Sequence, residues 1–94
     1  MDITLYMSKS EGLYDCVGHV KVSQYRVKTI KFLADGFKMP SEVAKELDIG
    51  TSHASNVLNT LKEYNLVECV NPDVKKGRLY QNTPLGMEVL KYLD

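Results

Sequence analysis

The stretch at residues 39–65, MPSEVAKELDIGTSHASNVLNTLKEYN, constrains the fold of this chain more than any other. Its apolar spacing predicts a helix over 41–47, with Ser41 as N-cap, and a longer helix over 51–64. Asp48-Ile49-Gly50 separates them, and we expect Gly50 to supply the backbone freedom of a sharp turn. The apolar residues predicted to face inward are Val43, Ala44, Leu47, Ala54, Val57, Leu58, Leu61 and Tyr64.

The opposite face of the longer helix carries mostly short polar side chains. It carries Ser52, Ser55, Asn56, Asn59 and Glu63, with no long cation. Solvated helix faces usually carry Glu and Lys pairs, and Ser and Asn are mediocre helix formers. Their side chains can, however, hydrogen-bond to base edges and phosphates, and a helix-turn-helix places such a face in the major groove. The pattern favours DNA recognition over a plain polar face on a helical hairpin.

A strand-like pair follows at residues 66–82. Leu66–Val70 and Leu79–Gln81 flank the turn formers Asn71, Pro72, Asp73 and Gly77, which predicts a two-stranded hairpin. Its tip is basic, with Lys75, Lys76 and Arg78. Basic loop tips can reach a phosphate backbone or a minor groove, although solvated lysines are the simpler alternative.

These two features give one set of predicted DNA-binding residues. His53 flanks the polar face, where a partly packed surface histidine is the competing interpretation. The complete set is Ser41, Thr51, Ser52, His53, Ser55, Asn56, Asn59, Lys62, Lys75, Lys76 and Arg78.

Composition limits the other function classes. Ninety-four residues suit one domain, and 12 basic residues balance 12 acidic ones, so net charge alone does not favour a nucleic-acid partner. Cys16 and Cys69 stand apart, which suggests a reducing compartment without structural zinc. We expect a cytoplasmic location, because neither a signal peptide nor a membrane-spanning stretch is visible. Neither His19 nor His53 belongs to a catalytic or metal-binding motif, so we expect no enzyme activity, metal or cofactor.

From Ser23 to Leu90 the chain resembles the winged-helix regulators of archaea and bacteria, the group that includes MarR-like and ArsR-like repressors. The pieces are SQYRVKTIKFL, PSEVAKELDIGTSHASNVLNTLKEYNLVE and KKGRLYQNTPLGMEVL, in that order. The resemblance implies a DNA-binding transcriptional regulator, usually dimeric. Metal-sensing relatives carry a cysteine in the recognition region, whereas Ser52-His53-Ala54-Ser55 has none.

Two further helices are predicted, at 24–34 after the N-cap Ser23 and at 84–93 after the N-cap Thr83. Each carries more apolar surface than one buried face needs, and a second copy of the chain is the expected cover. Packing under residues 1–22 is the alternative. The predicted interface residues are Tyr25, Phe32, Leu85, Val89, Leu90, Tyr92 and Leu93.

Residues 1–22 alternate apolar and polar positions, which suggests an extended arm or a hairpin, or a terminus that orders only against a partner. We therefore divide the chain into this segment and a winged-helix domain at 23–94. The expected fold class is mostly α with a small antiparallel β-hairpin, a winged helix-turn-helix. The expected function is sequence-specific binding of double-stranded DNA for transcriptional control, as a homodimer with any effector unknown. The alternative is a winged helix that serves as a protein-interaction module.

Overall fold

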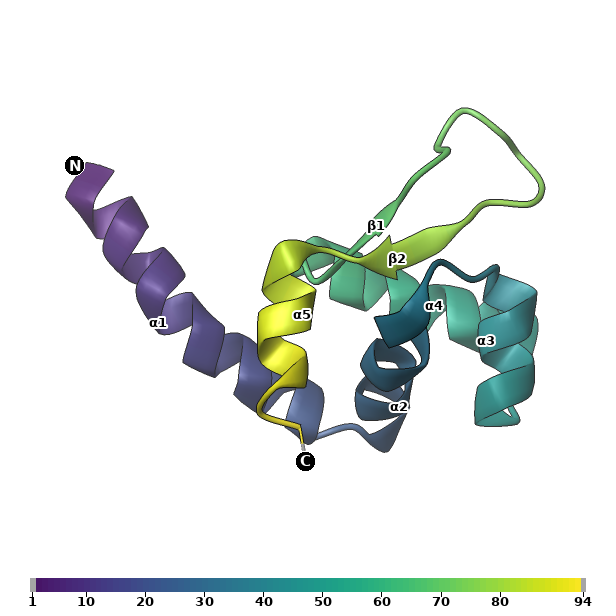
Figure 1. Ribbon diagram of the computed structural model, residues 1–94, viewed down its shortest axis with the longest axis horizontal. Helices are drawn as coiled ribbons and strands as arrows, with labels where there is room; N and C mark the ends of the chain where they lie inside the picture. Colours follow the sequence, from purple (N-terminus) through teal and green to yellow (C-terminus); the bar gives the residue numbers. More distant parts are fainter. Residues whose placement is uncertain (1, 94) are drawn as a thin grey trace.

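The computed structural model describes residues 2–93, with side chains from residue 12 onward. Figure 1 shows a helical body from which the tip of a hairpin projects on one side and the first turns of α1 lead away on the other. The elements in chain order are α1 (Asp2–Lys21), α2 (Gln24–Phe32), the 3₁₀ turn η1 (Leu33–Asp35), α3 (Pro40–Leu47), α4 (Thr51–Glu63), β1 (Val67–Cys69), β2 (Tyr80–Asn82) and α5 (Pro84–Leu90). This order and arrangement confirm the predicted winged-helix fold.

One hydrophobic core joins all the helices to the hairpin. Each helix contributes the apolar side of its own periodic pattern, so a single contiguous cluster forms. Its most completely buried side chains are Val20, Ile30, Leu33, Val43, Leu58, Leu61, Leu66, Val67 and Val89. The inward stripe predicted for α4 is confirmed at Ala54, Val57, Leu58 and Leu61.

The helix-turn-helix differs from the prediction in two details, one at the start of α3 and one in the turn between α3 and α4. The N-cap of α3 is Met39, not Ser41, because Pro40 occupies the first helical position and Glu42 Oε1 accepts from the Met39 N–H at 2.7 Å. The left-handed residue is Asp48, with φ 59°, whereas Gly50 has an ordinary φ of −70°. Asp is one of the few residues that tolerate this conformation, so the turn does not need glycine there.

The hairpin predicted across residues 67–81 is confirmed. Strands β1 and β2 are antiparallel, and Cys69 stands opposite Tyr80. Tyr80 also forms an isolated bridge with Lys38, in which each backbone N–H donates to the other residue's carbonyl at 2.9 Å. The connection between α2 and α3 is therefore attached to the hairpin by backbone hydrogen bonds.

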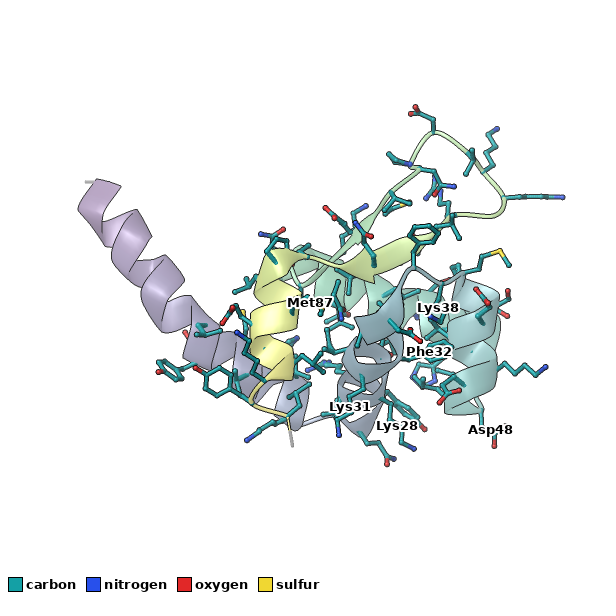
Figure 2. All side chains as sticks on the ribbon, in the orientation of Figure 1. Lys28, Lys31, Phe32, Lys38, Asp48 and Met87 are labelled. Atoms are coloured by element: carbon teal, nitrogen blue, oxygen red, sulfur yellow. The ribbon has the colours of Figure 1, made fainter. Side chains whose placement is uncertain are left out.

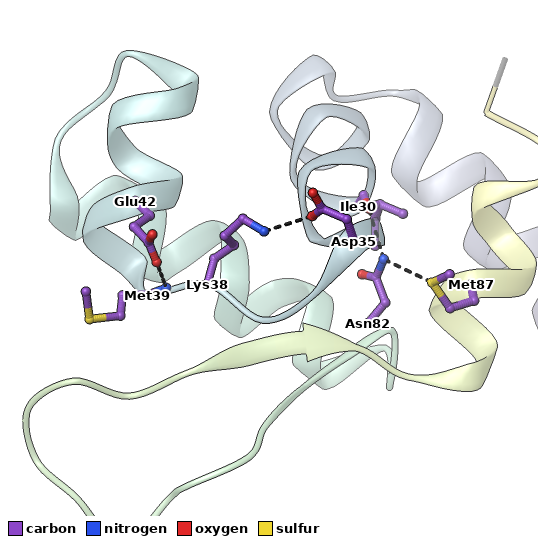
Figure 3. A network of polar contacts seen from close by, with 7 residues as sticks. All are labelled: Ile30, Asp35, Lys38, Met39, Glu42, Asn82 and Met87. Atoms are coloured by element: carbon purple, nitrogen blue, oxygen red, sulfur yellow. Dashed lines mark hydrogen bonds and ion pairs between the residues drawn. The ribbon is translucent and has the colours of Figure 1, made fainter.

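Helix α5 starts as predicted and joins the base of the hairpin. The Thr83 hydroxyl accepts from Gly86 N–H at 3.0 Å and donates to the Asn65 carbonyl at 2.7 Å. Figure 3 shows Asn82 at the end of β2, where its side-chain amide donates to the Ile30 carbonyl at 2.9 Å. The amide thus ties the hairpin to α2. Helix α5 ends at Leu90, three residues before the predicted end at residue 93.

The extended structure expected for residues 1–22 is wrong, because α1 runs from Asp2 to Lys21. The apolar positions Leu13, Cys16, Val17 and Val20 follow a spacing of three, one and three, which makes one helical stripe on the core. The alternation that suggested a strand ran through Tyr14, Cys16, Val20 and Val22, but Tyr14 is 67% exposed. The helix was mistaken for extended structure because the helical stripe and the strand-like alternation share Cys16 and Val20.

Two aromatic contacts add to the core packing of α1. The Tyr14 ring meets the Tyr92 ring edge-on, with centroids 6.1 Å apart. The His19 ring stacks on Tyr64 with centroids 3.6 Å apart. Tyr64 was predicted to face inward from α4, but it follows the end of that helix and is 41% exposed.

Candidate nucleic-acid interface

The polar face of α4 and the hairpin tip meet at one surface hollow of about 290 Å³. Ser55 and Asn59 contribute one wall from α4, and Lys75 and Arg78 contribute the other from the loop at 71–78, which we call the wing. Four residues predicted separately from two distant motifs therefore lie around a common space. Pro40, Gly77 and Tyr80 complete its lining, and no pattern in the sequence had connected them with the site.

The α4 side of this surface has free hydrogen-bonding capacity. Ser52, Asn56 and Asn59 are exposed and Ser55 is half-buried. Within residues 12–93, none of these four side chains hydrogen-bonds to another part of the chain. Each Asn amide offers both donors and an acceptor, the combination that reads adenine in the major groove. The face can therefore bind a polar ligand without first breaking internal bonds.

The remaining predicted contacts lie outside the hollow. Ser41 is exposed in the first turn of α3, and Thr51 is exposed as the first residue of α4. Lys62 is exposed in the last turn of α4. The His53 ring packs edge-on against Tyr25, with centroids 5.0 Å apart, so this histidine also has a packing role.

The wing supplies the positive charge. Lys75 and Lys76 are exposed at its tip, and neither forms an ion pair within residues 12–93. Arg78 is exposed too, but its guanidinium donates to two wing carbonyls, at Val74 and Pro72. All the donors of the two lysines are thus free for an outside phosphate, whereas part of the Arg78 guanidinium is engaged within the wing.

A second hollow, of about 520 Å³, lies between α2 and α3, with mixed charge around it. Figure 2 shows Lys28 and Lys31 there, beside Phe32 and Lys38. Lys38 Nζ lies 2.8 Å from Asp35 Oδ1 and 4.9 Å from the Phe32 ring centroid. The Lys38 ammonium, by hydrogen bond and by charge, holds the pKa of the Asp35 carboxyl below its ordinary value. The carboxylates of Asp35 and Glu46 also line this hollow, so its charge is mixed and it suits a polyanion less well than the wing.

The predicted interface residues do not form one surface. Val89 and Leu93 are buried in the core of this chain, and Leu85 and Leu90 are half-buried against it. Tyr25 packs on His53, and Phe32 lies under Lys38. Tyr92 remains, 40% exposed on the same side as Tyr14 of α1. Sequence reasoning missed Tyr14 because it placed α1 in extended structure.

None of the helices within residues 2–93 combines the length and apolar content that a membrane crossing requires. Among residues 12–93, whose side chains are described, no three His, Cys, Asp or Glu side chains gather closely enough to hold a metal ion.

The fold is found in proteins of known structure. Reduced HlyU from Vibrio cholerae N16961 matches with a TM-score of 0.73 and 18% identity, over 94% of this chain and 88% of that one. A MarR family transcription regulator matches with a TM-score of 0.67 and 14% identity, over 97% of this chain and 66% of that one. The structure of NadR in complex with 4-hydroxyphenylacetate gives 0.68 and 16%, over 98% and 69%.

At the level of sequence, no family model and no curated protein matches this chain. These three structural matches lie under 20% identity, and they extend over almost the whole chain, α1 included. They therefore show a shared fold, in agreement with the predicted winged helix.

Proposed function

We propose that this chain is a sequence-specific regulator of transcription that binds double-stranded DNA, with α4 in the major groove and the wing on the flanking backbone. The observation that carries the proposal is the common hollow between Ser55 and Asn59 of α4 and Lys75 of the wing. Base-reading amides and phosphate-binding cations belong together in such an interface. One of the matched folds is, by its own description, a transcription regulator.

Within α4, sequence is read by Asn56 and Asn59. Both are exposed, and an Asn amide can bridge N6 and N7 of adenine in the major groove. Ser52 and Ser55 are shorter and can accept or donate to bases or phosphates. The side chains of Lys75 and Lys76 hold the backbone beside the groove, which fixes the orientation of α4 without reading sequence.

The regulator acts as a homodimer through α1 and α5. Tyr14 and Tyr92 present exposed aromatic surface at the contact between these helices, and Leu90 on α5 is half-buried beside the core. The first turns of α1 reach beyond the body of the chain (Figure 1), where a second copy could pair with them. In such a dimer the two half-sites on the DNA should lie about 34–36 Å apart, near one helical turn, or at a multiple of it.

Duplex binding by three variants tests the proposed interface, on an operator selected from random DNA. Asn56→Ala should cost about 1–3 kcal/mol and relax preference at one base pair. Lys76→Ala should weaken binding to every duplex alike and lower the salt slope by about one. Lys28→Ala is the matched control, because Lys28 is also exposed and forms no ion pair within residues 12–93, but it lies on α2, outside both the hollow beside the wing and the proposed α1–α5 contact.

The proposal fails if Asn56→Ala and Lys76→Ala both bind the selected operator as the unmodified chain does. It also fails if the control weakens binding as much as Lys76→Ala, because the effect would then follow overall charge and not the wing.

A protein-interaction module is the second candidate, and the zero net charge favours it. A neutral chain has no general attraction for a polyanion, so only a local basic surface could bind DNA. The salt dependence of duplex binding separates the two functions. Binding that weakens steeply with salt supports the DNA regulator, whereas the absence of duplex binding at low salt supports the module.

A further inference from the structure

Beyond the last backbone hydrogen bond of the hairpin, side-chain hydrogen bonds hold the two arms of the wing together. The last backbone bond of the ladder joins Val70 N–H to the Leu79 carbonyl at 2.8 Å. Beyond it, the Asn71 amide continues the pattern: its Oδ1 accepts from Leu79 N–H at 2.8 Å, and its Nδ2 donates to the Gly77 carbonyl at 3.1 Å. One side chain thus joins the two arms of the loop in place of a further pair of residues.

Arg78 makes a second closure nearer the tip. Its Nε donates to the Val74 carbonyl at 2.8 Å, and its terminal nitrogen donates to the Pro72 carbonyl at 3.4 Å. A guanidinium holds several donors in a fixed planar arrangement, whereas a lysine ammonium is a compact charge on a flexible stem. Arginine can therefore hold two carbonyls of the opposite arm at once.

We propose that Asn71 and Arg78 are positioning residues, which hold the wing in one shape and so present Lys75 and Lys76 to the DNA backbone. The inference rests on the proposed function, and it assigns Arg78 to the loop where the sequence had suggested a direct contact. A loop already ordered in the free protein loses less conformational entropy when it binds. Gly77 allows the chain to reverse direction in the loop, because its φ of 74° lies in the left-handed region that favours glycine.

The test combines two measurements on Asn71→Ala, Arg78→Lys and Arg78→Ala, with Lys76→Ala as the reference for a direct contact. The first measurement is amide hydrogen exchange of residues 73–79 in the free protein. The second is duplex affinity over a range of salt concentrations. Thermal unfolding of each variant serves as a check on folding, because the wing is exposed and should add little to global stability.

We expect Asn71→Ala and Arg78→Lys to speed exchange in the loop about tenfold and to weaken duplex binding about tenfold. Neither changes the charge of the wing, so the salt slope should stay as it is in the unmodified chain. Lys76→Ala should do the reverse: a lower salt slope with unchanged exchange. Failure of the lysine to replace Arg78 would show that geometry, not charge, is what this position supplies.

The proposal is overturned if Arg78→Lys leaves exchange and affinity unchanged, or if Arg78→Ala lowers the salt slope without altering exchange. In the second case Arg78 touches phosphate directly. The exchange measurement needs no DNA, so it separates the two proposals. Faster loop exchange in a protein that binds no duplex would uphold the closure of the wing and reject the DNA function.

Discussion

His19 shows how a single residue can join three helices. From α1, its ring stacks on Tyr64, its Nδ1 lies 3.2 Å from a terminal nitrogen of Arg26, and its carbonyl accepts from the same nitrogen at 2.8 Å. Its Nε2 is buried, with no hydrogen-bond partner within residues 12–93. Burial first, and the Arg26 charge second, lower the pKa of His19 below its ordinary value of 6.5.

This environment predicts a loss of stability in acid. The folded chain favours neutral His19 and the unfolded chain binds its proton more readily, so the contribution is present above pH 6.5 and lost as pH falls below it. His19→Phe keeps a ring on Tyr64 and removes the titration. Urea unfolding at pH 8, 6 and 5 should show a smaller acid-induced loss of unfolding free energy for His19→Phe than for the unmodified chain. Equal losses would refute this role of His19.

Neither His19 nor Asn71 could have been assigned these roles from the sequence. Tyr64 lies far along the chain from His19, and only the packing of α1 against the end of α4 brings them together. Asn71 was recognised as a turn former, but a propensity does not say which carbonyl or N–H a side chain will reach. Local signals did suffice for the caps Ser23 and Thr83, because a cap bonds within its own first turn.

At the scale of elements, α5 lies against the base of the hairpin at Gly86. A Cβ added there would overlap the carbonyl oxygen of Leu66, which is fixed backbone. Gly86→Ala should therefore push α5 away and destabilise the chain by about 1–3 kcal/mol, as measured by urea unfolding. The sequence showed a glycine near a helix start, but not the close approach that requires it.

Gly18 of α1 provides the matched control. A Cβ there meets nothing within 4 Å, and the residue lies in a helix interior. Gly18→Ala should stabilise the chain by about 0.5–1 kcal/mol, because alanine loses less backbone entropy in a helix. If both substitutions shift the urea midpoint in the same direction, the close contact at Gly86 is not what fixes α5.

The elements that the sequence predicted well are those with several turns of consistent apolar spacing or a clear boundary signal. Helices α2, α3 and α4 and the hairpin have both, and their positions agree to within about two residues. In α1, Gly12 and Gly18 interrupt the helical pattern, and short alternating runs imitate strands. In the candidate interface, the polar face of α4 could be predicted from the helical periodicity of the sequence. The hollow beside it could not be predicted, because it depends on how far the wing folds back toward α4.

At the scale of the whole molecule, the proposed dimer makes a clear prediction for Tyr14. Tyr14→Glu places a charge on the exposed aromatic surface between α1 and α5, where burial of an unpaired carboxylate is costly. Sedimentation at micromolar concentration should show a dimer for the unmodified chain and a monomer for Tyr14→Glu. Operator affinity should fall with it, because one half-site is then lost.

Val22→Glu is the control for this variant. Val22 is 79% exposed just after the end of α1, eight residues beyond Tyr14, and it forms no part of the aromatic contact, so Val22→Glu introduces the same charge beside that contact. It should leave the sedimentation coefficient at the dimer value. A monomer for the unmodified chain, or equal effects of the two variants, would reject α1 and α5 as the dimer contact.

The bridge between Lys38 and Tyr80 has a consequence for how such a dimer would measure DNA. These backbone bonds fasten the segment before α3 to β2, the strand that follows the wing. We therefore expect the helix-turn-helix and the wing to move as one body. In the proposed dimer, the distance between the two DNA-binding surfaces would then depend on the angle at which α1 and α5 of one copy pack against α1 and α5 of the other. The proposed dimer would therefore adjust its spacing on DNA at the α1–α5 contact, and not within either DNA-binding surface.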